Sequence, residues 1–212
     1  MRQVILILLL LLFSSSVYAE RRSQIWNKND ILIHPWKYFD LNVAEKIQYS
    51  PQNNAVEQKY GELFVIHKPL TWFDYGLGYR VSYSNVEIDW VQENRAMLVA
   101  EFKQQYHNFW FKFSNRFEYR DYKADLDHFR YKQQFTVTFP SLASWGMQFY
   151  TSEESFTKLN GVGTHLARLY GGISGVHSKH FQLKLYYAFE KYKLIENWNS
   201  RDIMGLNLSF IL

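Results

Sequence analysis

The chain has 212 residues, a formal net charge of +4, no cysteine and 19% aromatic residues. This length suits one domain, and the absence of cysteine excludes a disulfide framework and thiolate chemistry. Lysines and arginines are spread among acidic residues and form no long runs, so the sequence does not suggest a nucleic-acid partner.

Residues 1–19 have the features of a secretory signal peptide. Arg2 is followed by an apolar stretch over residues 4–13, and Val17-Tyr18-Ala19 carries small residues at the two positions that a signal peptidase inspects. This stretch is too short for a spanning helix, although an uncleaved membrane anchor is the alternative. Because charged residues begin at Glu20, we expect export and cleavage after Ala19.

The remaining chain divides into a lead-in segment over residues 20–35 and a single domain over residues 36–212. Within the lead-in, Ile31-Leu32-Ile33 could form one extra strand. After residue 19 the longest apolar run covers only residues 96–100, which excludes a helical membrane protein.

Alternation of apolar and polar residues with a period of two is the main signal in this domain. Between residues 72 and 83 every odd position from Phe73 to Tyr83 is apolar or aromatic, whereas the even positions include Asp74 and Arg80. A strand places such residues on opposite faces. The pattern returns over residues 109–120, 128–139, 180–190 and 204–212, and more weakly over 39–49, 61–67 and 95–102. About ten residues or more per strand matches a tilted transmembrane strand.

Four tryptophans mark a repeat along the domain. Trp36, Trp72, Trp110 and Trp145 each follow a short turn and are separated by 36, 38 and 35 residues, and Phe181 continues the series. Each interval holds two strands, which predicts an antiparallel up-and-down barrel of about ten strands. Twelve strands is the alternative if Ile31-Leu32-Ile33 is a strand, because bacterial single-chain barrels have even numbers.

The same repeat predicts the topology in a membrane. The turns before the tryptophans are short and face the periplasm, and the loops on the other side are longer, above all at 155–164 and 192–200. The four tryptophans then form half of an aromatic girdle at the level of the lipid headgroups. The alternative is that they are core aromatics of a soluble barrel.

Three features favour an outer-membrane barrel over a soluble one. The apolar face is rich in large aromatics, and the polar face carries charges that can pair, as in Arg116-x-Glu118-x-Arg120. The chain also ends in a strand with apolar residues at 204, 206, 208, 210 and 212, which resembles a signal for barrel assembly, although Leu212 stands where an aromatic is usual. The expected partners are outer-membrane lipid and the barrel-assembly machinery of a Gram-negative bacterium.

The predicted inner face carries a network of charges. Its members are Arg80, Arg95, Glu101, Lys112, Arg116, Glu118, Arg120, Arg130, Lys132, Glu154, Arg168, Lys184 and Glu190. We expect these residues to fill a narrow lumen, and an anion-favouring lining or binding site is the alternative if the lumen is open. Because cations outnumber acids, pairing is incomplete and the lumen would favour anions.

Catalytic and metal sites are weakly supported. No histidine shares a strand face with a serine and an acid, and His177 and His180 lack an acidic neighbour. No phosphate-binding glycine motif is present, so we expect no metal and no cofactor. A lipid-acting outer-membrane enzyme and a soluble periplasmic ligand-binding barrel remain as alternatives.

Several short motifs together resemble a known family. They are Asn94-Arg95, Arg116-x-Glu118-x-Arg120, Arg130-x-Lys132, Glu153-Glu154-Ser155-Phe156, residues 168–172 and Gly205-Leu206-Asn207-Leu208. The chain resembles the outer-membrane barrel family called domain of unknown function 2490, although Lys132 stands where a second arginine is expected. The resemblance implies a β-barrel in Gram-negative bacteria and implies no activity.

Overall fold

The computed structural model describes residues 22–86, 89–122, 128–142, 146–160, 163–178, 180–194 and 197–212. The predicted signal peptide and Trp145 lie outside these residues. The described chain contains no helix long and apolar enough to cross a membrane. The strands are β1 (Arg22–Trp36), β2 (Phe39–Ser50), β3 (Ala55–Leu70), β4 (Phe73–Val86), β5 (Asp89–Tyr106), β6 (Phe109–Tyr122), β7 (His128–Thr138), β8 (Gln148–Lys158), β9 (Gly163–Ser178), β10 (Phe181–Leu194) and β11 (Asn197–Ile211).

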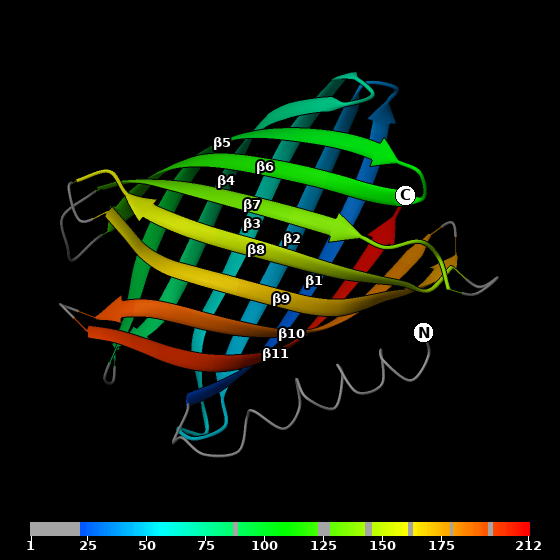
Figure 1. Ribbon diagram of the computed structural model, residues 1–212. Coiled ribbons are helices and arrows are strands. Elements are labelled where there is room, and N and C mark those ends of the chain that lie inside the picture. The colour runs from blue at the N-terminus through cyan, green and yellow to red at the C-terminus, as the bar shows by residue number, and fades with distance from the viewer. Residues whose placement is uncertain are drawn as a thin grey trace.

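These strands form one closed barrel in which each strand pairs with the next in the chain (Figure 1). Ten neighbouring pairs are antiparallel, and β1 closes the barrel against β11 in parallel. The parallel seam follows from the count, because an up-and-down chain with an odd number of strands ends in the direction in which it began. Leu212 extends the seam by donating its backbone N–H to the Leu32 carbonyl at 2.9 Å.

The all-β, up-and-down barrel predicted from the sequence is therefore confirmed, with eleven strands in place of ten or twelve. The difference lies in β1, which occupies the segment expected to be a lead-in. Its pattern is weak because Asn27 and Asn29 interrupt the outward face between Ile25 and Ile31. β1 raises the number of strands to eleven, and its parallel pairing with β11 closes the barrel without a twelfth strand.

The lengths of the connections differ from the prediction. The loops expected over 155–164 and 192–200 are short, because β8 runs to Lys158 and β10 runs to Leu194. The longest connection, residues 139–147, was expected to be a tight turn. Pro35 and Pro69 lie within strand ends where the ladders shift register, so Trp36 closes β1 and does not open a strand. Proline lacks the N–H that a regular ladder needs, which accounts for both shifts.

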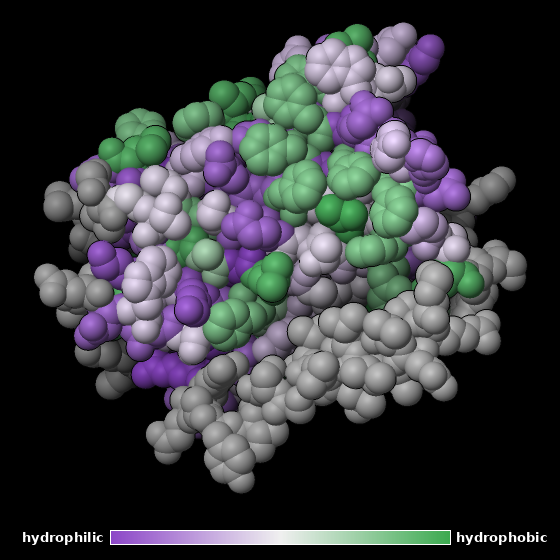
Figure 2. All heavy atoms as spheres, in the orientation of Figure 1, coloured by the Kyte–Doolittle hydropathy of each residue, from purple (hydrophilic) through white to green (hydrophobic). Residues whose placement is uncertain are grey.

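The wall separates an apolar outer face from a polar interior. Leu77, Leu98 and Met204 are between half and two thirds exposed on the outside. In Figure 2 apolar side chains gather over β5, β6 and β7, and hydrophilic ones interrupt them near the middle. Two of the outward polar residues bond through one tyrosine, because the Tyr131 hydroxyl donates to Asn115 Oδ1 and accepts from Gln133 Nε2 at 3.2 Å.

A similar contact joins β1 and β2 on the outside, where Asn29 Nδ2 donates to Glu45 Oε1 at 3.0 Å. Glu153 on β8 is a further exposed acid of this wall. Polar residues thus interrupt the apolar outer face on β1 and β2 and on β6 to β8.

Part of the interior is packed with apolar and aromatic residues. Trp26, Ala188 and Ile203 are fully buried, and the rings of Tyr170 and Tyr186 pack against them. Tyr186 lies opposite Gly205 on the neighbouring strand. A Cβ added to Gly205 would overlap the ring of Tyr186, so this position needs glycine for close approach.

We expect Gly205→Ala to lower the free energy of unfolding by about 1–3 kcal/mol, because the Tyr186 ring must leave its packed position. Gly171→Ala is the matched control, since a Cβ there meets no atom within 4 Å. Urea unfolding followed by tryptophan fluorescence measures both. Equal stability of the two variants would contradict this packing.

Candidate functional site: the charged lumen

Strand alternation places five glutamates inside the barrel, where their side chains are almost completely buried. They are Glu62, Glu93, Glu118, Glu154 and Glu190, on β3, β5, β6, β8 and β10. Burying a carboxylate in a protein interior is tolerable only when cations and hydrogen-bond donors surround it. Each of these glutamates contacts at least two cationic side chains, as the following contacts show.

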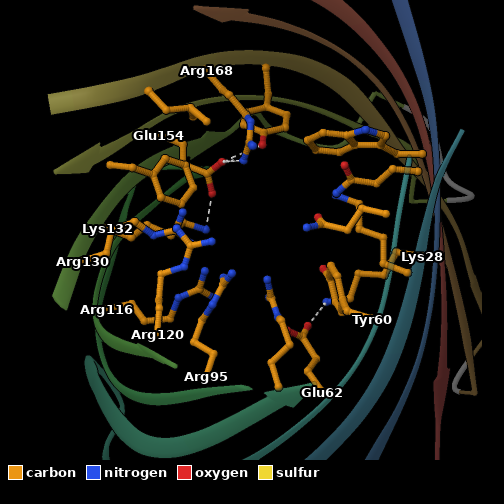
Figure 3. A pocket seen from close by; sticks show the side chains of 18 of the residues that line it. Lys28, Tyr60, Glu62, Arg95, Arg116, Arg120, Arg130, Lys132, Glu154 and Arg168 are labelled. Atoms are coloured by element: carbon orange, nitrogen blue, oxygen red, sulfur yellow. Dashed lines mark hydrogen bonds and ion pairs between the residues drawn. The ribbon is translucent and has the colours of Figure 1, made fainter. Parts of the chain in front are cut away.

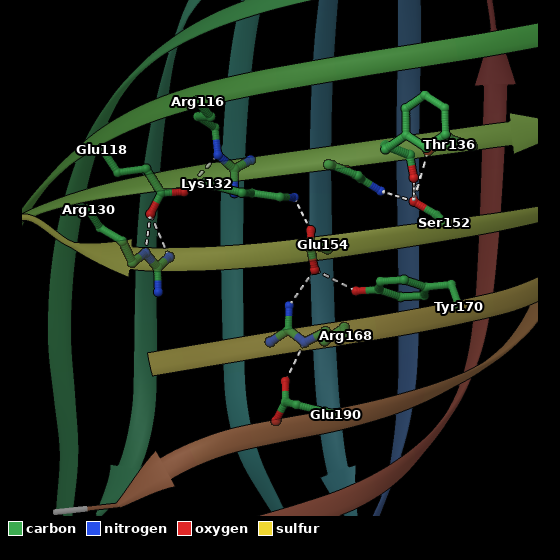
Figure 4. A network of polar contacts seen from close by, with 12 residues as sticks. Arg116, Glu118, Arg130, Lys132, Thr136, Ser152, Glu154, Arg168, Tyr170 and Glu190 are labelled. Atoms are coloured by element: carbon green, nitrogen blue, oxygen red, sulfur yellow. Dashed lines mark hydrogen bonds and ion pairs between the residues drawn. The ribbon is translucent and has the colours of Figure 1, made fainter. Parts of the chain in front are cut away.

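Glu118 is the most highly coordinated of the five. Its Oε1 lies 2.7 Å from Arg116 Nε, and its Oε2 lies 2.5 Å from Arg130 Nη2 (Figure 4). The same Oε2 lies 3.4 Å from Arg95 Nη1. None of its surface is exposed. Three arginines from β5, β6 and β7 therefore converge on one carboxylate.

Glu93 holds two of the arginines on the same wall. Arg120 forms a bidentate pair with it, with Nε and Nη2 each 2.8 Å from a different carboxylate oxygen. Arg95 Nη2 lies 2.6 Å from Glu93 Oε1, so Arg95 bridges Glu93 and Glu118. Such two-point contacts fix the guanidinium planes.

Strands β8 to β11, together with Lys132 of β7, contribute a second chain of contacts. Glu154 pairs with Lys132, accepts from Arg168 Nη1 at 2.8 Å and accepts from the Tyr170 hydroxyl at 2.7 Å. Arg168 continues to Glu190, which also pairs with Arg201 (Figure 4). On the opposite wall Glu62 pairs with Arg80 and with Lys28, whose Nζ is 3.0 Å away.

The cations exceed the acids in this layer. Five glutamates face ten cationic side chains around one cavity: Lys28, Lys46, Arg80, Arg95, Arg116, Arg120, Arg130, Lys132, Arg168 and Arg201. The formal excess is therefore five positive charges among the described residues. This excess gives the lumen a positive potential and favours anions within it.

The strand register places several of these cations directly opposite one another. Lys28 pairs with Lys46, Arg116 with Lys132, and Arg95 with both Arg80 and Arg120. Like charges directly opposite each other destabilise a sheet. Apolar side chains of similar volume would fill the space at less cost. The register thus places like charges next to one another at a cost to the stability of the sheet.

The charged side chains leave space between them. A cavity of about 300 Å³ is bounded by the ten cations, and Figure 3 shows labelled side chains from several strands pointing toward its centre. A second cavity of about 580 Å³ extends toward the end of the barrel that holds Trp110, Thr138 and Gln148. Both are large enough for a small molecule or several waters.

The two cavities meet at a set of residues that we call the junction. The junction residues, which line both cavities, are Trp26, Lys28, Lys46, Lys132, Glu154 and Tyr170. Each lies in the interior of its strand, away from the strand ends. The lumen thus holds two adjoining cavities, and three lysines lie where they adjoin.

The structure brings most of the predicted charge network together. Eight members line the smaller cavity: Arg80, Arg95, Arg116, Arg120, Arg130, Lys132, Glu154 and Arg168. Glu118 and Glu190 are buried behind their arginine partners. Lys184 and Lys112 line the larger cavity, where Glu101 pairs with Lys112 at 3.4 Å.

The predicted tryptophan girdle divides in the structure. Trp36 and Trp72 are exposed on the outside, where Trp72 stacks on Phe102 with ring centroids 6.3 Å apart. Trp110 instead lines the larger cavity, because it shares strand parity with Lys112 on the inner face. Trp110 is therefore not part of an outward girdle.

Sequence reasoning missed five charged residues of this site: Lys28, Lys46, Glu62, Glu93 and Arg201. Lys28 lies in the segment interpreted as a lead-in, where Gln24, Trp26 and Lys28 alternate with outward residues. Lys46 and Glu62 lie in two of the segments whose alternation is weak, residues 39–49 and 61–67. Residues two positions apart on a strand share a face, so Glu93 lies on the same inner face as Arg95. In the same way Arg201 lies on the same face as Gly205.

The described residues contain no group of three or more side chains placed to hold a metal ion. His128 stacks on Tyr122 and lies near Arg120, with 3.4 Å between Nε2 and Nη1. The chemistry available in the lumen is consequently that of many N–H donors, tyrosine hydroxyls and aromatic rings, which bind anions and polar molecules.

Comparison with known proteins places the chain in one family. No curated protein and no solved structure matches the chain. A family model described as "Protein of unknown function (DUF2490)" matches residues 23–201, which run from β1 into β11 and include all of the charged lumen described above. The chain therefore belongs to the DUF2490 family.

Proposed function

We propose that the protein is an outer-membrane β-barrel whose narrow, cation-lined lumen admits small anions. The observation that carries this proposal is the combination of an apolar outer wall with an interior where ten cations face five glutamates. A protein in water does not need an apolar exterior around a charged interior. A barrel in lipid requires an apolar exterior and can hold a polar interior.

The lengths of the strands support the membrane assignment. β5 has 18 residues and β3 has 16, whereas strands of soluble domains usually have about 5–6. A tilted strand of about 9–11 residues already spans the hydrocarbon core. Closure through the β1–β11 seam removes free sheet edges, which lipid does not tolerate.

The two ends of the chain fit the same proposal. The signal peptide predicted in residues 1–19, with cleavage after Ala19, provides export across the inner membrane. The final strand presents Met204 and Phe210 on the outer wall, as a strand recognised by the barrel-assembly machinery would. Outer-membrane lipid is the expected environment.

The charge excess sets the ion preference. Ten cations and five glutamates surround the smaller cavity, which leaves an excess of five positive charges. A cation that enters this layer is therefore repelled. An anion entering it is attracted by side chains that are already oriented by the glutamates. We therefore expect passage of small anions at a low rate, because the lumen is narrow.

The proposal predicts that the protein sediments with outer-membrane fragments and migrates differently on gels before and after boiling. Purified protein should give stable single-channel currents in planar bilayers and should release no fatty acid from phospholipid. Lipid turnover without conductance would support a lipid-acting enzyme instead. Recovery as a freely soluble periplasmic protein would overturn the membrane assignment.

A further inference from the structure

The junction between the two cavities differs from the rest of the charged layer. Glu154 is its one carboxylate, whereas Lys28, Lys46 and Lys132 all reach it. Lys28 also pairs with Glu62, and Lys132 pairs with Glu154. Lys46 forms no ion pair with any carboxylate among the residues that the structure describes.

Lys46 is held in place without an acid. Its side chain is almost fully buried, and its Nζ lies 3.1 Å from the centroid of the Trp26 ring. Trp26 is fixed in turn because its indole N–H donates to Gln24 Oε1 at 2.8 Å. Lys28 lies directly opposite Lys46 on β1, and Arg168 lies over the same Trp26 ring, so cations are close to it on both sides.

Neighbouring groups connect Lys46 to Lys132 along one wall. Arg168 lies 4.9 Å from the Trp26 ring that Lys46 contacts, and Arg168 donates to Glu154, which pairs with Lys132. The Tyr170 hydroxyl also donates to Glu154. The ammonium groups are therefore set in a fixed frame and are not free surface lysines.

We propose that the junction is a binding site for a phosphate dianion, either inorganic phosphate or the phosphate group of a small ester, with Lys46 as its main ligand. Lys28 and Arg80 share Glu62, Lys132 and Arg168 share Glu154, and Lys46 pairs with no carboxylate of the described residues, so the junction keeps a positive excess that a dianion reduces. Lysine ammonium groups each offer three donors, a number that suits a tetrahedral oxyanion with several acceptor oxygens. This inference rests on the proposed function and names the anion that the lumen retains.

The position of the junction favours a soluble phosphate over a lipid headgroup. Lys46 is separated from the β2–β3 connection by Ile47 to Ser50, and Lys28 lies near the centre of β1. A headgroup of a lipid outside the wall lies at the rims of a barrel, whereas the junction is reached only through the two cavities.

The experiment is calorimetric titration of the protein, purified in neutral detergent without added lipid, with inorganic phosphate. We expect saturable binding, with nitrate, a monovalent oxyanion, bound at least about tenfold more weakly. Lys46→Gln should weaken phosphate binding by about tenfold or more, and Lys46→Arg should retain most of it, because a charge-assisted hydrogen bond is lost only in the first variant. Phosphate should raise the Tm of the wild type more than that of Lys46→Gln.

Lys184→Gln is the matched control, because Lys184 lines only the larger cavity and forms no ion pair among the described residues. It should leave phosphate binding within about twofold of the wild type. An equal loss in both variants, or no saturable binding by the folded wild type, would overturn the proposed site. Competition by phosphatidylglycerol added to the micelles, but not by phosphatidylcholine, would assign the site to a headgroup and overturn the choice of a soluble phosphate.

The outcome is separable from that of the proposed function. Binding in micelles requires no conduction, so phosphate binding without bilayer currents would contradict the pore and leave the site. The opposite outcome is a protein that does not bind phosphate but gives anion-selective currents that phosphate does not reduce. That result would contradict the phosphate site and would still support the pore.

Discussion

Leu98→Arg is expected to destabilise the protein folded in lipid vesicles, lowering its free energy of unfolding by about 2–4 kcal/mol. Leu98 lies inside β5 and is half exposed on the outer wall, where it pairs with Leu77 and Phe117 on the neighbouring strands. An arginine at the middle of a hydrocarbon layer must lose its hydration or reach toward the surface. Denaturant titration of the variant in vesicles measures the loss.

Leu142→Arg provides the matched control for this prediction. Leu142 is similarly exposed, but it lies in the connection between β7 and β8 and outside the strands. The same change there should cost about 0–1 kcal/mol, because the side chain stays at or beyond the membrane surface. If the two variants fold equally well in vesicles, the outer wall of β5 does not face lipid.

Glu118→Ala is expected to lower the free energy of unfolding by about 3–5 kcal/mol. The substitution removes a carboxylate with no exposed surface that contacts Arg95, Arg116 and Arg130. Three arginines would then remain close together without their shared counter-ion. Unfolding in urea, followed by the loss of heat-modifiable mobility, gives the difference from the wild type.

A control of the same residue type lies on the outside of the barrel. Glu153→Ala removes an exposed glutamate from β8 and should change stability in detergent by less than about 1 kcal/mol. A small effect of Glu118→Ala, comparable to that of Glu153→Ala, would mean that water or ions compensate the arginines and that the ion-pair cluster does not stabilise the wall.

The sequence predicts the class of this fold well because period-two alternation is a local property. Phe73 to Tyr83 alternate cleanly, and the structure places this segment in β4 with the aromatics outward. The number of strands depends on β1, whose outward asparagines hide the alternation. Asn29 donates to Asn27 on its own strand and to Glu45 on the next strand, and the second contact is revealed only by the register.

The same distinction applies to the site. Alternation correctly groups Arg116, Glu118 and Arg120 on one face, because they are two residues apart. The excess of cations around the junction arises from residues far apart in the chain, such as Lys46 and Arg168. Register and barrel closure bring such residues together, and neither is encoded in the spacing of one strand.

The most direct test of the account is the reversal potential of the wild-type protein in a planar bilayer with a tenfold gradient of potassium chloride. An outer-membrane barrel with an excess of lumen cations predicts a reversal potential shifted toward the equilibrium potential of chloride. A reversal potential shifted toward that of potassium, or the absence of any current from correctly inserted protein, would contradict an anion-favouring lumen.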